Sequence, residues 1–270
     1  MLTKTLFYIN FLLNNYIFVL VNLNLNKMKY IYLLIILLFV SINSMSQTII
    51  TDRPDQTESS STIEIGSIQI ESGVLIIEND SHREKNLYLP TTLFRLGLTN
   101  TIELRVLNEF EYKIYETHSI NGFNDLEIGV KLQLLQKEDV ATELAFLSHV
   151  VLPTASQFFS EEKFGVINKL CVSHESNGNI GVGYNVGYNY YENRTGDFTY
   201  SFVLGFEITN KLNAYLEPYG EIVDLERSMS NINMGITYLL QDNIQLDYSF
   251  GTGINHTFNF MSIGCSLQIF

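Results

Sequence analysis

The side chains that could support catalysis in this sequence are spaced unfavourably for it. Ser148 directly precedes His149, and Ser173 directly precedes His174. On a β-strand, adjacent side chains point to opposite faces, so neither serine could pair with its neighbouring histidine as nucleophile and base. Glu143 shares a strand face with His149 but lies about 20 Å from it along the strand. We therefore expect no catalytic residues and no enzyme activity.

The cysteines and the charge balance exclude two further kinds of site. Cys171 and Cys265 lack the closely spaced Cys or His partners of a zinc site, so we expect no metal and no other cofactor. The chain has 16 Lys and Arg against 29 Asp and Glu, a net charge of -13, and its basic residues form no cluster. Because phosphate binding depends on clustered positive charge, we expect no nucleic-acid partner.

An export signal is predicted near the beginning of the chain. Met28 and a lysine precede an apolar run over 30–40, and the small residues Ser44 and Ser46 follow it. This order is typical of a secretory signal peptide over 28–46, cleaved after Ser46. The apolar run is too short to cross a membrane as a helix.

Residues 1–27 would then form an upstream extension, and both Met1 and Met28 stay open as the start of translation. A membrane-anchoring helix over 5–21 is the alternative, which the asparagines in that stretch disfavour.

After the export signal, apolar and polar residues alternate over most of the chain. Between Phe198 and Ile208, every second residue is apolar and the residues between them are mostly small or polar. Such alternation predicts a β-strand with one apolar face and one polar face. The pattern predicts twelve strands, over 66–77, 88–97, 102–112, 123–134, 140–152, 164–174, 180–190, 198–208, 212–220, 231–239, 244–253 and 258–270.

The strand lengths and connections favour a membrane barrel. Most strands approach the roughly 9 to 11 residues that a tilted strand needs to cross a bilayer. Short links alternate with longer ones, which is typical of an outer-membrane barrel; the longer ones include 79–87, 153–163 and 221–230. A soluble β-sandwich or lipocalin-like barrel is disfavoured because the polar phase is too rich in Gly, Asn, Glu and Arg to form a core. We predict an all-β fold, a transmembrane antiparallel up-and-down β-barrel of about 12 strands over 65–270.

Several segments resemble one family of outer-membrane proteins. They are 66–73, 152–154, 235–239, 242–247 and the motif around Asp52, Arg53, Pro54, Asp55, Gln56, Thr57 and Glu58. On these residues the chain resembles the MetA-pathway of phenol degradation family, whose members are often labelled transporters. The resemblance implies an outer-membrane barrel with a transport role, for aromatic or other apolar compounds.

The inward phase of the predicted strands carries many charged residues. They are Arg95, Glu103, Arg105, Glu109, Glu127, Lys131, Glu143, His149, Glu207, Glu217 and Asp247. One interpretation is an acid-biased pore lining that favours cations. The other is a set of salt bridges that fills a narrow lumen, and a barrel of this size allows both.

The polar segment over 47–64 precedes the first strand, and two placements are open for it. It could fold into the lumen as a plug or gate whose charges pair with the wall, or it could form a periplasmic tail.

We predict an outer-membrane transporter or channel for passive uptake or efflux of a small solute, with an aromatic or apolar compound as one candidate. The alternatives are a closed structural or surface-binding barrel, acting through loops such as 153–163 and 221–230, and an outer-membrane lipid-modifying enzyme. The expected location is the Gram-negative outer membrane after export. The expected partners are outer-membrane lipid, lipopolysaccharide, the barrel-insertion machinery and an unidentified solute.

Overall fold

The computed structural model describes residues 48–79, 84–137, 140–160, 163–175, 179–192 and 194–269. The predicted upstream extension and signal peptide, together with Gln47 and Phe270, lie outside these residues. Within the described ranges, no helix has both the length and the apolar character needed to cross a membrane.

The described residues form thirteen strands that belong to one sheet. The strands are β1 (Ile68–Asn79), β2 (Glu84–Thr99), β3 (Ile102–Ile114), β4 (Ser119–Phe123), β5 (Leu126–Lys137), β6 (Val140–Leu152), β7 (Gly165–Glu175), β8 (Ile180–Tyr191), β9 (Asp197–Thr209), β10 (Leu212–Val223), β11 (Arg227–Gln241), β12 (Ile244–Gly253) and β13 (Asn259–Ile269).

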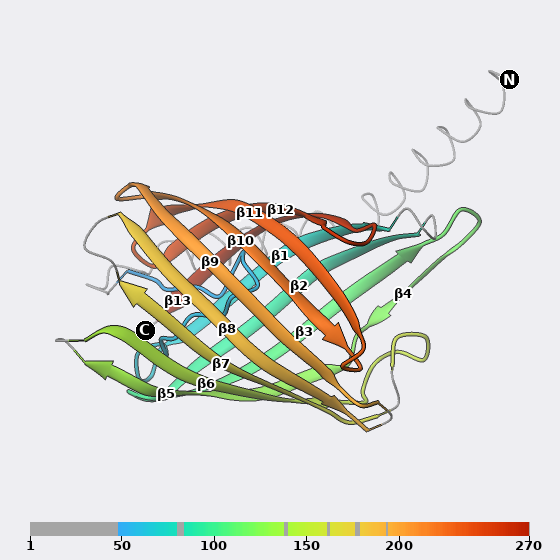
Figure 1. Cartoon of the computed structure of the whole chain (residues 1–270), viewed down its shortest axis with the longest axis horizontal. Coiled ribbons are helices and arrows are strands. Elements are labelled where there is room, and N and C mark those ends of the chain that lie inside the picture. Colours follow the sequence, from blue (N-terminus) through green and yellow to red (C-terminus); the bar gives the residue numbers. More distant parts are fainter. Residues whose placement is uncertain are drawn as a thin grey trace, which may run out of the picture. The chain divides into compact units, whose positions relative to one another are not determined.

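Antiparallel pairing of neighbours closes the sheet into a barrel (Figure 1). β1 pairs with β13 from Ile68 opposite Ile269 to Glu78 opposite Asn259, which joins the first strand to the last. β4 and β5 both pair with β3, β4 along its second half and β5 along its first half, so the two together occupy one position in the barrel. The predicted twelve-strand antiparallel barrel is therefore confirmed.

Several predicted strand boundaries agree with the structure, but two predicted long links are wrong. Residues 84–87 of the predicted link over 79–87 belong to β2, which pairs with β1 up to Glu84 opposite Asn79. β6 and β12 have the bounds that alternation gave. The predicted long link over 221–230 is instead a tight turn, because β10 and β11 stay paired up to Val223 opposite Arg227. Asp224 and Leu225 turn the chain with φ of 51° and 58°. Outward residues such as Ser228 are polar there, so the apolar alternation that marks a strand ends before the strand does.

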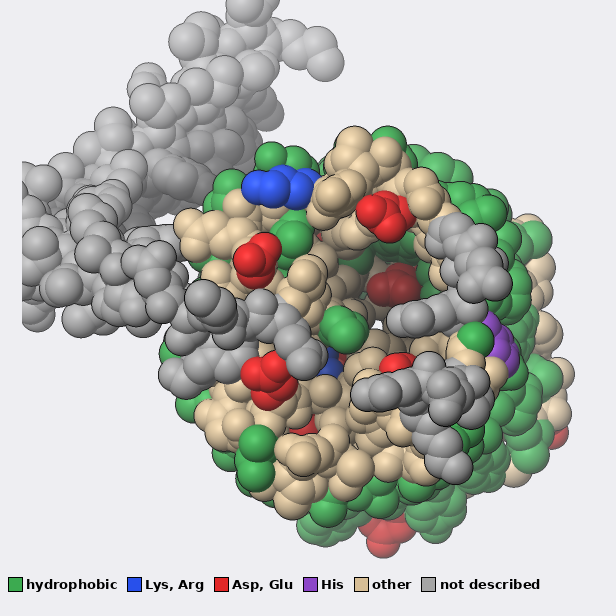
Figure 2. All heavy atoms as spheres, turned by 90° about the vertical axis from the view of Figure 1, so that its left-hand side faces the viewer, with side chains coloured by type: hydrophobic (Ala, Val, Ile, Leu, Met, Phe, Trp, Pro, Cys, Tyr) green, Lys and Arg blue, Asp and Glu red, His purple; other side chains and the backbone are tan. Residues whose placement is uncertain are grey.

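The outer face of the barrel is apolar and the inner face is polar. Met234, Phe250 and Met261 lie side by side on β11, β12 and β13, and their exposed fractions are 39%, 45% and 50%. Their neighbours along the strands, including Asn233 and Ser262, are buried on the inside. Figure 2 shows apolar side chains around the flank and a hollow at the centre of the end that carries the short turns. An exposed apolar band of this kind needs a lipid environment.

The lipid-facing position of Met234 predicts the effect of a charge there. Met234→Arg should lower the free energy of unfolding by about 2 to 4 kcal/mol in bilayers, because a guanidinium on the lipid face must be desolvated or pull water into the membrane. Urea unfolding in liposomes, followed by far-ultraviolet circular dichroism, measures this. The control is Glu226→Arg in the turn between β10 and β11, which should change stability by less than about 0.5 kcal/mol. Equal effects of the two variants would contradict the assignment of Met234 to lipid.

Candidate functional site

Residues 48–67 lie inside the barrel and will be called the lumen segment (Figure 1). Both ends of this segment are fixed at the end of the barrel that carries the short turns. The backbone N–H of Ile49 donates to the carbonyl of Asp242 at 2.7 Å, and that of Gly66 donates to the carbonyl of Gly97 at 2.8 Å. The segment contains no strand, so its backbone groups depend on the barrel wall for hydrogen-bond partners.

Carboxylates on the wall supply these partners. Glu71 of β1 accepts hydrogen bonds from the backbone N–H groups of Asp52 and Arg53, at 3.0 to 3.1 Å. Glu217 of β10 accepts from the backbone of Gln56 and from both the backbone and the hydroxyl of Thr57. The wall therefore holds the lumen segment by its backbone as well as by its side chains.

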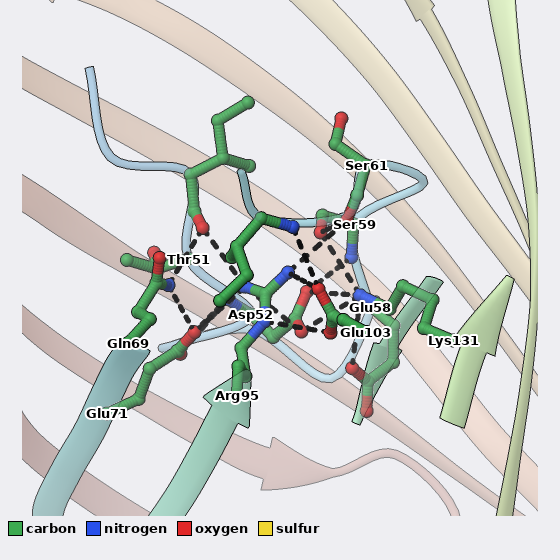
Figure 3. Close-up of polar contacts among 12 residues, drawn as sticks. Thr51, Asp52, Glu58, Ser59, Ser61, Gln69, Glu71, Arg95, Glu103 and Lys131 are labelled. Carbon is green, nitrogen blue, oxygen red and sulfur yellow. Dashed lines mark hydrogen bonds and ion pairs between the residues drawn. The ribbon is translucent and has the colours of Figure 1, made fainter. Parts of the chain in front are cut away.

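The charged side chains at the centre form an ion-pair cluster between the lumen segment and the wall (Figure 3). Asp52 accepts from Arg105 at 2.5 Å and from Lys131 at 2.9 Å, and it lies 3.4 Å from Arg95. The three cations are at most 1% exposed. Four acids and four bases make up the cluster: Asp52, Glu58, Glu71, Glu103, Arg95, Arg105, Lys131 and Lys169.

The cluster is balanced in charge, which buried ions require. Arg95 bridges Glu71 at 3.1 Å and Glu103 at 2.9 Å, and Arg105 contacts Glu103 at 2.8 Å. Glu58 at the other side of the lumen segment contacts Arg105 at 2.7 Å and Lys169 at 3.4 Å. Without Asp52 and Glu58 of the lumen segment, the cluster would contain the four bases of the wall and only two acids, Glu71 and Glu103. The lumen segment thus neutralises the wall.

A second attachment lies at Arg53, which contacts β12 and β13 next to β1. Its guanidinium contacts Asp247 at 3.0 Å and donates to the hydroxyl of Ser262 at 2.9 Å. Gly73 and Gly264 pair directly across β1 and β13, and a Cβ on either would lie 2.4 Å from the guanidinium. The two glycines therefore leave the space on the wall in which Arg53 lies.

Three acids at the tip of the lumen segment, Asp52, Asp55 and Glu58, differ in their electrostatic surroundings. Burial alone would raise the pKa of Asp52, but the charges of Arg95, Lys131 and Arg105 outweigh it and hold that pKa well below its usual range. Glu58 behaves in the same way, and its pKa is lowered. Burial raises the pKa of Asp55 well above its usual range, and the neighbouring Glu217 raises it further.

The predicted inward residues are divided between several contacts. Arg95, Glu103, Arg105 and Lys131 meet in the ion-pair cluster. The others lie elsewhere in the barrel: Glu217 and Asp247 hold the lumen segment, Glu143 accepts from Ser60 and Ser61, His149 contacts Arg105 and Glu127, and Glu109 accepts from Asn124.

Glu207 does not join these residues, because it is exposed near the end of β9. The residues of the N-terminal motif, from Asp52 to Glu58, all belong to the lumen segment.

Gln69, Glu71 and Lys169 also face the lumen, although they were not among the predicted inward residues. Gln69 and Glu71 alternate with outward isoleucines on β1, a signal that was present in the sequence. On β7, the adjacent Asn168 does not face the lumen. Asn168 instead accepts a hydrogen bond from Ser148, which lies on the face opposite to His149.

A cavity of about 590 Å³ lies in the half of the barrel nearer the long loops, and will be called the vestibule. Its floor is the tip of the lumen segment, from Asp52 to Glu58. Its wall comes from strands around the barrel, and Phe258 and His256 contribute from the loop before β13. Within the described ranges, no group of three or more His, Cys, Asp and Glu is arranged to hold a metal ion.

The ion-pair cluster predicts a strong dependence on Asp52. Asp52→Asn removes one negative charge from between three buried cations, so the free energy of unfolding should fall by about 3 to 5 kcal/mol at pH 7. Urea unfolding followed by circular dichroism measures the loss. Because the native pKa of Asp52 is lowered, its contribution is present above the ordinary aspartate pKa and is lost only as the pH falls through the lower native value. Asp242→Asn in a short exposed turn is the control, and equal effects of the two variants would refute the cluster as a source of stability.

Asp55 predicts the opposite dependence on pH. Its native pKa is raised, so ionisation costs the native state stability as the pH rises above the ordinary aspartate value. Asp55→Asn should therefore match the wild type at pH 3 and unfold at higher urea concentration than the wild type at pH 8. Glu58→Gln is a matched comparison of opposite sign, because the native pKa of Glu58 is lowered. A lower urea midpoint for Asp55→Asn at pH 8 would show that the Asp55 carboxylate stabilises the fold.

The barrel has the same fold as solved structures of outer-membrane porins. The KdgM porin in complex with disordered oligogalacturonate superposes with a TM-score of 0.53 at 10% identity, over 74% of this chain and 98% of that chain. The NanC porin gives a TM-score of 0.52 at 11% identity, over 73% of this chain and 98% of that chain. A search of curated proteins finds no match to this sequence.

Residues 51–259 match the family model described as "Putative MetA-pathway of phenol degradation". The match begins inside the lumen segment and extends to the start of β13, so it includes the floor of the vestibule as well as its wall. The predicted resemblance is therefore confirmed, and the chain belongs to this family.

Proposed function

We propose that the protein is a channel of the outer membrane through which small solutes diffuse passively, with the lumen segment as its gate. The observation that carries the proposal is the vestibule, a cavity of about 590 Å³ enclosed by a barrel with an apolar outer face. The porin fold and membership of the family support the same function. Export through the predicted signal peptide over 28–46 is part of the proposal.

The gate is proposed because the lumen segment lies on the route through the barrel. A solute that leaves the vestibule toward the short-turn end meets the tip of the segment, which forms the vestibule floor. The segment is held by side chains of the wall and is not a strand of the sheet, so it can shift without breaking the pairing of the barrel. The hollow in the short-turn end gives a displaced segment or a passing solute access to the periplasmic side (Figure 2).

The surface-binding alternative has less support. One of the two loops proposed for it, 221–230, is a tight turn between β10 and β11. The other, 153–163, forms a larger connection before β7, but no described feature of it favours a particular partner.

A reversible crosslink between the lumen segment and the wall tests the gate. The hydroxyls of Thr57 and Ser201 lie 2.8 Å apart, so cysteines at these positions can form a disulfide with little movement. Thr57→Cys with Ser201→Cys, in a Cys171→Ser and Cys265→Ser background, should show several-fold less conductance in planar bilayers when oxidised than after reduction. Peptide mapping under non-reducing conditions verifies the bond.

Two controls complete the crosslink experiment. The cysteine-free parent and Thr57→Cys alone should respond to neither oxidant nor reductant. Equal conductance of the oxidised and reduced double variant would refute the gate, whereas a reduced protein that is folded but never conducts would refute the passive channel itself.

A further inference from the structure

The vestibule has a predominantly apolar wall at the level where a solute would enter. Six inward residues share this character and come from five strands, namely Leu75, Ile77, Leu93, Leu107, Tyr219 and Phe260. Pockets that bind small molecules combine such apolar walls with a few polar groups that fix orientation. The polar groups of the vestibule therefore decide which solutes it accepts.

The positive charges that line the vestibule are already paired. Arg53 contacts Asp247 at 3.0 Å, and Lys169 contacts Glu58 at 3.4 Å. Arg105 is shared between three carboxylates of the ion-pair cluster. A negatively charged solute would have to compete with these buried carboxylates for each cation, which costs more than it returns in a region of low dielectric constant.

By contrast, some hydrogen-bond acceptors that line the vestibule have no partner among the described residues. Asn231 is only 8% exposed, and its Oδ1 has no hydrogen-bond partner. The buried Oδ1 of Asn189 also has none. Glu221 lines the same cavity and takes part in no ion pair among the described residues. These groups can accept hydrogen bonds or a positive charge, and none of them is a cation.

Two of these acceptors, Asn231 and Glu221, lie close to the aromatic ring of Tyr219. Asn231 on β11 is directly opposite Tyr219 on β10, and Glu221 follows Tyr219 on the same inward face. An aromatic ring beside a carboxylate attracts organic cations, because the ring face and the carboxylate are both electron-rich. Carboxylates outnumber bases along the rest of the lining as well, where Glu109 and Glu127 face the same cavity.

We propose that the vestibule selects small solutes that carry a protonated amine on an apolar, preferably aromatic, body. The amine donates to Asn231 and is neutralised by Glu221, while the apolar part contacts Tyr219 and the aliphatic wall. This inference rests on the proposed channel function and adds the class of solute. Carboxylate and sulfonate solutes of the same size are disfavoured because no unpaired cation receives them.

The test compares two probes of similar size and opposite charge. The full-length protein, matured on export, is placed in planar bilayers, and reversal potentials are measured in gradients of benzylammonium chloride and of sodium benzenesulfonate at pH 6. Permeability to benzylammonium should exceed permeability to benzenesulfonate by about tenfold or more at low salt. The preference should decrease at high salt, as screening weakens the field of the carboxylates.

Matched variants locate the selectivity. Glu221→Gln should reduce the preference for benzylammonium several-fold, and Asn231→Leu should weaken it while leaving the net charge unchanged. Glu207→Gln removes the same charge from an exposed position near the end of β9 and should have no effect. Heat-dependent mobility in gels verifies that each variant is folded.

The outcomes separate the two levels of the proposal. Conductance without a preference for benzylammonium, or a preference that Glu221→Gln and Asn231→Leu leave unchanged, overturns the inference and leaves the channel function intact. A folded wild-type protein that conducts neither probe nor potassium chloride overturns the channel function and the inference together.

Discussion

The need to pair buried charge inside a barrel governs the structure of this protein. The inward phase of the strands places Arg95, Arg105 and Lys131 at positions that are almost completely buried. Unpaired cations there would carry a large desolvation cost. The wall itself supplies Glu71 and Glu103, and the remaining negative charge comes from the lumen segment.

This requirement explains why a segment without strands has a defined position. Asp52 and Glu58 bring their charges to the cluster, and wall carboxylates such as Glu217 accept hydrogen bonds from the segment's backbone. The lumen segment and the wall supply each other's hydrogen-bond and ion-pair partners. Removing either would leave buried polar groups of the other without partners. Backbone hydrogen bonds fix the two ends of the segment, and side chains of the wall hold its tip, so the tip is separate from the sheet and able to serve as a gate.

The same pairing divides the lumen into two regions of different chemistry. In the half nearer the short turns, cations and carboxylates neutralise one another around Asp52. In the vestibule the bases remain committed to these pairs, and the acceptors of Asn231 and Glu221 are left for a solute. The solute selectivity proposed for this barrel therefore depends on which charged groups of the wall are paired with the lumen segment and which are not.

The sequence by itself determined the barrel. Alternation depends only on the two-residue period of a strand, so the strands, the inward charges and the family motif could be read without a structure. It did not identify β4 or the tight turn after Val223, because strand ends beyond the apolar band lack the alternation that marks a strand. Only the tertiary structure decided where the lumen segment lies and which charges meet. Asp52 and Lys131 are far apart in the chain, and their contact follows from strand register and barrel closure, which no local pattern specifies.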